Sequence, residues 1–192
     1  QKQFSRPFKK IVGMALREDW PEKRENALNE IKRIIKEGNK VGKVIVISNR
    51  LYGSGPYKHF LKGLKLKEGS DVTIVATGHL VWEALKASES LMEKGINSEI
   101  INIHTIKPLD EDIILESVSK TGCVVSAEEH NIFGGLGESI SRLLTTKMPV
   151  PQEFVGTKDT FGESGTPLEL MDKYGLNSSS IFESAVKVLK RK

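Results

Sequence analysis

The sequence predicts an α/β protein with an open, mainly parallel sheet and helices on both of its faces, in three layers. Two patterns lead to this fold class. Short apolar runs of strand length alternate with longer segments whose apolar residues recur every three or four positions, as on one face of a helix. Strands that alternate with helices in this way pair in parallel, because each helix returns the chain to the same end of the sheet.

Residues 1–66 predict one strand–helix–strand (βαβ) unit followed by a short helix. Pro21 and Glu22 suit the first turn of a helix, where a proline loses no hydrogen bond and a carboxylate favours the positive end of the helix dipole. Gly38 suits its end. The expected elements are a strand at 10–16, a helix at 22–37, a strand at 43–48, a glycine-rich loop at 51–56 and a helix at 57–64.

The same alternation starts afresh at residue 67 and predicts the rest of the sheet. A helix from His79 to Lys94 carries an apolar stripe and is closed by Gly95. Asp110 is a favourable N-cap for the helix that follows. The expected strands lie at 71–77, 98–103, 122–126 and 151–156, and the remaining helices at 134–146, 166–174 and 178–191.

Composition excludes several classes of protein. The 192 residues include one cysteine, Cys123, so a scaffold of internal disulfides is excluded. The apolar neighbours of Cys123 indicate a small buried side chain rather than a nucleophile. No run of about 18 apolar residues is present, and residues 1–20 lack the pattern of a secretory signal. We therefore expect a soluble, cytoplasmic protein without a membrane partner.

Charge is distributed unevenly along the chain. Residues 1–66 contain 16 Lys and Arg against 6 Asp and Glu, whereas residues 67–192 contain 13 against 19. This step indicates a domain boundary near Leu66, preceded by a basic βαβ segment that could dock on or extend the sheet of the second domain. A basic segment can bind nucleic acid, but no aromatic-rich or zinc-finger motif accompanies it. We therefore interpret it as a solvated surface and do not expect a nucleic-acid partner.

Glycines surround the start of the helix expected at 134–146. Gly134, Gly135, Gly137 and Ser139 stand where free backbone N–H groups and the helix dipole favour an anion, so they are candidates for binding a phosphate or a cofactor. The spacing matches neither a dinucleotide-binding motif nor a P-loop. The alternative is that glycine lets the helix approach the sheet closely. A phosphate-binding or small-molecule-binding module is thus one functional hypothesis.

The segment Glu128–Asn131 (EEHN) is expected on a loop at the carboxyl end of a strand, where open α/β sheets carry functional groups. Adjacent carboxylates and an imidazole can perform acid–base chemistry or bind a metal. Because neighbouring side chains of an extended segment point apart, a metal site would need a distant third ligand, for which His79 and His104 are the candidates. An active-site rim, a subunit interface and an ordinary structural loop are the alternatives, and we expect no metal.

The segment 158–165 (KDTFGESG) combines opposite charges, glycines and an aromatic ring. It is too polar for a core and too constrained for a linker. We interpret it as an ordered surface loop at a subunit contact. Lys158, Asp159 and Phe161 are its candidate contact residues.

Four segments of the second part of the chain resemble one known family. They are VTIVATGHLVWEAL at 72–85, INIHTIKPLD at 101–110, VVSAEEHNIFGGLGES at 124–139 and GTKDTFGESGTPLELMDKYGL at 156–176. In order and spacing they resemble the C-terminal domain of transketolases, especially the split-gene type, in which this domain belongs to a separate polypeptide. The resemblance covers residues 68–192 and implies a Rossmann-like, three-layer α/β domain.

The resemblance also implies which parts of the enzyme this chain lacks. A complete transketolase of the pentose phosphate pathway moves a two-carbon ketol unit between sugar phosphates with thiamine diphosphate and Mg²⁺, and its other domains supply the cofactor-activating glutamate and the diphosphate and metal ligands. We therefore expect this chain alone to bind no cofactor, to contain no catalytic residue and to serve as an assembly domain. Its expected partners are a second copy of the chain, an N-terminal transketolase subunit, or both. Glu129, His130 and Phe133 are the candidates for an active-site rim or interface.

Residues 1–66 do not share this resemblance. KVIVISNRLYGSGPY at 43–57 resembles the last βαβ portion of a flavodoxin-like chelatase of the sirohydrochlorin or cobalt type, but the chelatase's metal-binding histidines are absent and only His59 lies in this part. A chelatase-derived fragment is thus a further functional hypothesis. A natural fusion, a truncated fragment and an engineered chain all fit the sequence, and the missing initiator methionine fits a fragment.

Overall fold

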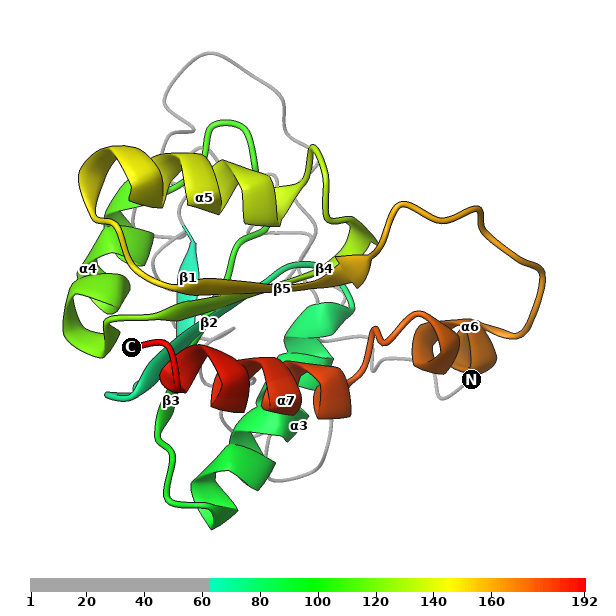
Figure 1. The fold of residues 1–192 in the computed structure, drawn as a ribbon, viewed down its shortest axis with the longest axis horizontal. Coiled ribbons are helices and arrows are strands. Elements are labelled where there is room, and N and C mark those ends of the chain that lie inside the picture. The colour runs from blue at the N-terminus through cyan, green and yellow to red at the C-terminus, as the bar shows by residue number, and fades with distance from the viewer. Residues whose placement is uncertain (1–62) are drawn as a thin grey trace, which may run out of the picture. The chain divides into compact units, whose positions relative to one another are not determined.

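The computed structural model describes residues 63–192, which form a five-stranded sheet with helices on both faces (Figure 1). The βαβ unit predicted over 1–66 lies outside the described residues except for its last four, so the boundary predicted near Leu66 stays a prediction. The elements are β1 (Leu64–Lys67), β2 (Val72–Ala76), α3 (Leu80–Glu93), β3 (Ser98–Asn102), α4 (Glu111–Thr121), β4 (Val124–Asn131), α5 (Leu136–Lys147), β5 (Gln152–Thr157), α6 (Pro167–Lys173) and α7 (Ser178–Leu189).

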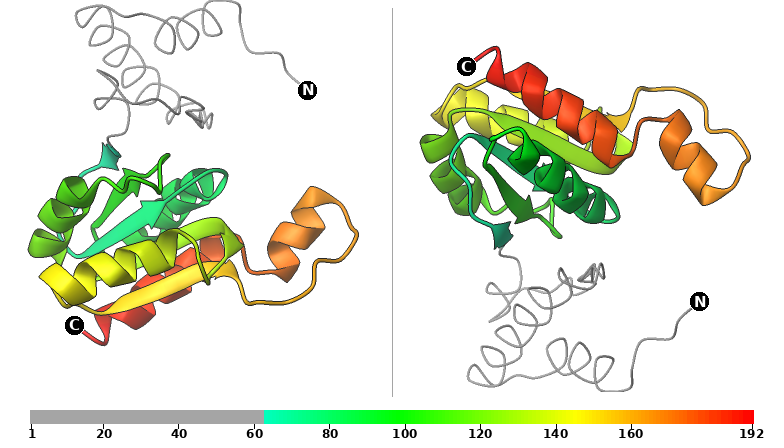
Figure 2. Two further views of the ribbon diagram at one scale, coloured as in Figure 1. Left: turned by 90° about the horizontal axis from the view of Figure 1, so that it is seen from above. Right: turned by 90° about the horizontal axis from the view of Figure 1, so that it is seen from below.

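The sheet has the strand order β1-β3-β2-β4-β5. The strands β2 to β5 are parallel to their neighbours, and β1 runs antiparallel at the edge beside β3. The helices α3 and α7 cover one face and α4 and α5 the other (Figure 2). This arrangement confirms the mainly parallel, three-layer α/β class expected from the sequence. The loops that follow β2 and β4 leave the same edge of the sheet toward opposite faces, an arrangement at which α/β proteins place their functional groups.

The core lies between the sheet and its two helical layers. The strand β2 is buried along its whole length, because helices cover both of its faces. Val75, Ile101 and Ile140 belong to the core on the side of α4 and α5. Cys123 is fully buried, as expected, and burial raises the pKa of its thiol. Among residues 63–192, no helix has the length and apolar character that crossing a membrane would require.

Two predicted elements differ from the structure. Leu64, expected to end a helix, instead begins the strand β1, whose four residues are too few to identify by alternation and which forms by pairing with β3. The strand β4 runs to Asn131, beyond the expected end at residue 126, because Asn131 still pairs with Thr157 of β5. The segment 128–131 therefore lies in a strand and not in a loop.

Asp110 stands at the N-cap position of α4, as expected, but its carboxylate does not cap that helix. Its Oδ2 accepts a hydrogen bond from the Gly63 N–H at 2.7 Å instead. The side chain thus joins the residue before β1 to the start of α4. Local capping rules cannot anticipate this contact, because its partner lies 47 residues away.

A buried carboxylate fastens the edge strand to the sheet. Glu99 of β3 is 0% exposed and forms ion pairs with Lys120 of α4 and, at 3.5 Å, with Lys65 of β1. The Gly69 N–H donates to Glu99 Oε2 at 3.2 Å. Burial by itself would raise the pKa of Glu99, but hydrogen bonds from Lys120, Ser117 and Gly69 lower this pKa from 4.5 to about 2.

The variant Glu99→Gln is expected to lower the free energy of unfolding by about 2 kcal/mol at pH 7, since it removes charged hydrogen bonds from a buried group. The pKa of Glu99 in the folded protein lies below its ordinary value, so its stabilisation is complete above pH 4.5 and is lost as the pH falls toward 2. Urea unfolding of the wild type and the variant between pH 7 and pH 2.5 should therefore converge at the acid end.

Glu68→Gln is the control for this measurement. It changes an exposed partner of the same two lysines, Lys65 and Lys120, and exposed ion pairs contribute little. It should keep the pH dependence of the wild type. A stability difference for Glu99→Gln that stays constant from pH 7 to pH 2.5 would contradict the role assigned to this carboxylate.

Candidate functional site

The buried residue Glu128 of β4 binds the start of α5. Its side chain is 1% exposed, and its two carboxylate oxygens accept hydrogen bonds from the N–H groups of Leu136 and Gly137 at 2.7 and 2.8 Å. These N–H groups belong to the first turn of the helix, where the backbone has no helical partner and the dipole favours negative charge. Glu128 is therefore the anion at this helix start.

The glycines of the turn make room for that contact. A Cβ atom at Gly135 would lie 2.0 Å from Glu128 Oε2, and one at Gly137 would lie 2.6 Å from the ring of Phe154. Gly134 has a φ of +76°, which favours glycine. These distances support the interpretation that glycine lets the helix approach the sheet closely.

The candidate anion-binding residues have partners within the chain. The Gly134 N–H donates to a carboxylate of α5 at 2.7 Å, and the Ser139 hydroxyl donates to the Gly135 carbonyl at 2.9 Å. The Gly137 N–H is bound by Glu128. An external phosphate at this helix start would have to displace a buried carboxylate, so the geometry favours a structural role for the turn.

Glu129 and His130 are exposed at the end of β4. His130 Nδ1 lies 2.8 Å from the Asn131 carbonyl oxygen, and His79 Nε2 lies 3.9 Å from a carboxylate of its own helix. Within residues 63–192, no group of three or more His, Cys, Asp and Glu side chains could hold a metal ion. The fold thus brings neither His79 nor His104 together with the pair on β4 as metal ligands.

Asn131 joins two loops that are distant in sequence. Its Nδ2 donates to the Asp159 carboxylate at 2.9 Å, and its Oδ1 accepts from the Phe133 N–H at 3.0 Å. Asp159 has a φ of +49°, a conformation that is costly for a residue with a Cβ atom. One amide side chain therefore holds both the turn after β4 and the first residues after β5.

Residues 158–174, here called the arm, project from the end of β5 away from the sheet (Figure 1). The arm contains α6, none of whose residues is buried. Phe161 is 99% exposed and Leu168 77%, and Phe133 on the neighbouring loop is 59% exposed. We call these three side chains the contact surface. Large apolar side chains that remain in water are typical of a face that another protein covers.

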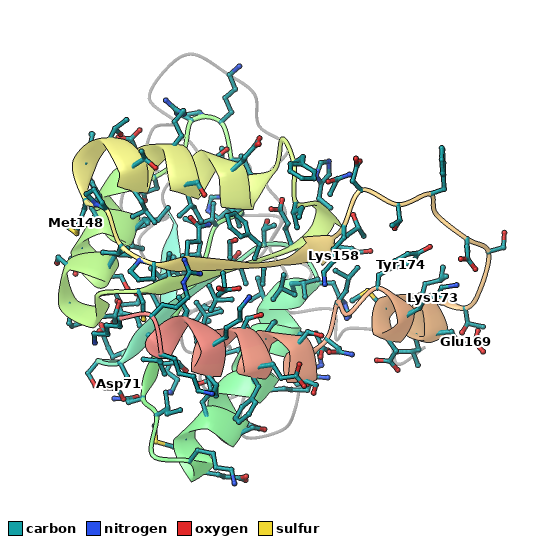
Figure 3. All side chains as sticks on the ribbon, in the orientation of Figure 1. Asp71, Met148, Lys158, Glu169, Lys173 and Tyr174 are labelled. Atoms are coloured by element: carbon teal, nitrogen blue, oxygen red, sulfur yellow. The ribbon has the colours of Figure 1, made fainter. Side chains whose placement is uncertain are left out.

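Polar contacts hold the arm in one shape, although nothing is buried beneath it. A capping box starts α6, and Lys173 pairs with Glu163, which raises the pKa of Lys173. Figure 3 shows Lys173, the last residue of α6, and Tyr174, which follows it, away from the sheet. The Tyr174 hydroxyl accepts from the Glu163 N–H at 3.0 Å and donates to the Phe161 carbonyl at 3.2 Å. These contacts give the arm a defined shape in the chain by itself.

Glu83 is a structural residue that sequence reasoning missed. It is 6% exposed, its Oε2 accepts from the Ser178 N–H at 2.8 Å, and its Oε1 pairs with Lys86 at 2.6 Å. The contact fastens the start of α7, just after the arm, to α3. No local pattern indicates a bond between residues 95 positions apart.

Comparison with known proteins gives consistent matches for this part of the chain. A family model described as "Transketolase, C-terminal domain" matches residues 61–181. The 6-deoxy-6-sulfo-D-fructose transketolase subunit SqwH of a Clostridium species is 47% identical over 131 residues, which are 68% of this chain and 41% of that protein. One subunit of the apulose-4-phosphate transketolase of Phocaeicola vulgatus is 35% identical over 130 residues, which are 68% of this chain and 41% of that protein.

The chain spans about two fifths of the length of these curated relatives. Among solved structures, a split-gene transketolase described as an inactive beta4 tetramer matches with a TM-score of 0.68 and 38% identity, covering 78% of this chain and 47% of that one. The family model does not extend to residues 1–60.

Proposed function

This chain belongs to the family of transketolase C-terminal domains, and from that premise we propose that it is the assembly domain of a transketolase-type enzyme. In this proposal it contributes subunit contacts and no catalytic group. The complete enzyme transfers a two-carbon ketol unit between sugar phosphates and binds thiamine diphosphate through other domains. The observation that carries the assembly role is Phe161, which is 99% exposed on an arm that hydrogen bonds hold in place.

The side chains of residues 63–192 do not form a site suited to thiamine diphosphate and its metal ion. These residues contain no set of three side chains that could hold a metal. The helix start best suited to a phosphate, that of α5, already binds Glu128. We therefore assign no step of the ketol transfer to this domain.

The names of the relatives support an assembly role. The Clostridium and Phocaeicola proteins are named as subunits of transketolases, and the similar solved structure is described as a tetramer of beta chains. By analogy, this domain contacts a second copy of the chain through the contact surface. An N-terminal subunit, or domains beyond the matched part of the relatives, supplies the cofactor site.

The purified chain is expected to bind no thiamine diphosphate. Titration calorimetry with thiamine diphosphate and Mg²⁺ should give only heats of dilution, because the described residues contain no group of side chains for a metal ion and Glu128 already binds the start of α5. A complete transketolase titrated under the same conditions is the positive control. Binding in the micromolar range, or turnover of sugar phosphates by the purified chain, would overturn the proposal.

A further inference from the structure

We infer that Tyr174 and Asn131 are positioning residues for assembly. They hold the arm and the turn after β4 of the free chain in the shape in which Phe161 and Phe133 contact a second copy. The inference rests on the proposed assembly function and deepens it, because it names the groups that prepare the contact surface.

Tyr174 is the first of the two. Phe161 is 99% exposed, so its own ring gives the loop no apolar support. The Tyr174 hydroxyl instead bridges the Phe161 carbonyl and the Glu163 N–H, on either side of Gly162. A Cβ atom placed at Gly162 would meet no atom within 4 Å, so the loop is open on that side. The Tyr174 hydroxyl therefore bridges the bend that presents Phe161, next to the ion pair of Glu163 with Lys173.

Asn131 is the second. It holds Asp159, at the base of the same loop, in a left-handed conformation that the residue would not favour by itself. The same amide accepts the Phe133 N–H. The loops that carry Phe161 and Phe133 are thus both hydrogen-bonded to the Asn131 side chain. A substitution of Asn131 is therefore expected to affect the position of both aromatic side chains.

This pre-ordering matters because association is opposed by the loss of conformational freedom. Ordering loops and side chains at an interface weakens binding, and a loop that already has its bound shape avoids that cost. The polar contacts of the arm are solvent-exposed and add little to folding stability. Their effect is therefore expected in the affinity between chains rather than in the melting temperature.

The charges of the arm favour a second copy as the occupant. Lys158 has no ion-pair partner among the described residues, and it stands on an arm in which both signs of charge are mixed. In a contact about a two-fold axis each patch faces the partner's copy of itself, so a patch that carries both signs can place Lys158 opposite an acidic residue of the second copy. The charged residues of the arm are Lys158, Asp159, Glu163, Glu169, Asp172 and Lys173.

The test is sedimentation equilibrium of the full 192-residue chain, with a double-mutant cycle. Phe161→Ala is expected to raise the dimer Kd by roughly 100-fold, as for an aromatic anchor. Tyr174→Phe keeps the ring, removes the hydroxyl and should raise the Kd by roughly tenfold. When Phe161→Ala is already present, Tyr174→Phe should raise the dimer Kd by less than about threefold more, because the aromatic side chain that Tyr174 positions is gone.

Hydrogen exchange gives a second readout that does not depend on association. In the Phe161→Ala protein, held below its dimer Kd, the Glu163 amide should exchange about five- to tenfold faster once Tyr174→Phe is added. Ser119→Ala is the matched control, since it removes an exposed hydroxyl that donates to the Glu116 carbonyl at 2.8 Å on α4. It should change neither the Kd nor the exchange of the arm.

The outcomes separate the two proposals. A wild-type chain that stays monomeric at all concentrations would overturn self-association, and a dimer unaffected by Phe161→Ala would overturn the choice of contact surface. A dimer that Phe161→Ala weakens but Tyr174→Phe leaves unchanged would keep the proposed function and overturn the positioning role. An exchange rate of the Glu163 amide that is the same with and without the Tyr174 hydroxyl would also overturn that role.

Discussion

Replacing Phe161 by aspartate is expected to convert the self-associated chain that we propose into monomers. The ring is 99% exposed in the chain by itself, so the substitution should leave the fold intact. In the assembly it would place an unpaired charge in an apolar contact, which costs several kcal/mol. A loss of about 4 kcal/mol corresponds to roughly thousandfold weaker association. Sedimentation velocity would report this as a shift of the main boundary to the monomer.

Met92→Asp is the matched control for that experiment. Met92 is also a large exposed side chain, 47% accessible, but it lies near the end of α3, just before β3 begins, whereas the arm follows the carboxyl end of the parallel strand β5. This variant should sediment like the wild type. If Phe161→Asp also sediments like the wild type, the arm is free in the assembly and the contact lies elsewhere.

Removing the carboxylate of Glu128 is expected to cause a large loss of stability. Glu128→Ala would leave the N–H groups of Leu136 and Gly137 without their partners in a buried part of the structure. Two unsatisfied donors of this kind cost about 3 kcal/mol together. For a domain of this size that loss corresponds to a melting temperature lower by roughly 10 °C. Thermal unfolding followed by circular dichroism would measure it.

Two comparisons sharpen this test. Glu129→Ala changes the exposed neighbour and should leave the melting temperature near that of the wild type. Phosphate added to Glu128→Ala should restore part of the lost stability, because the vacated helix start then resembles an ordinary anion site. Phosphate that stabilises the wild type as much as the variant would contradict the role of Glu128 and favour the hypothesis of an external anion.

Much of the sheet could be predicted from the sequence. The helix expected from His79 to Lys94 is α3, and the strand expected at 98–103 is β3. Both are bounded by local signals such as Gly95, whose φ of +74° suits the end of a helix. Apolar periodicity and glycine placement depend on near neighbours alone, so they can be read without the fold.

The edges of the sheet could not be predicted in the same way. The strand β1 is four residues long and exists because β3 offers it a partner. The end of β4 at Asn131 depends on Thr157 of β5, 26 residues further along the chain. Strand ends of this kind are set by pairing, which the sequence pattern of either strand does not contain.

The residues of the candidate site also differ in whether the sequence could identify them. Phe161 could be proposed as a contact residue from the polar, glycine-containing segment around it, and Phe133 from the resemblance to transketolases. Glu128 and Asn131 belong to a segment that the sequence analysis selected as a candidate site. The residues to which they hydrogen-bond could not be predicted from the sequence. Tyr174 and Glu83 had no sequence signal.

The sequence by itself determined the α/β class, the order of the elements from β2 onward and the resemblance to the transketolase family, because these depend on residue types and spacings along the chain. Only the tertiary structure decided that a buried glutamate occupies the glycine turn and that a tyrosine and an asparagine hold the exposed aromatic side chains in place. A hydrogen bond forms when a donor and an acceptor come within about 3 Å. For groups far apart in the chain, that distance is set by folding.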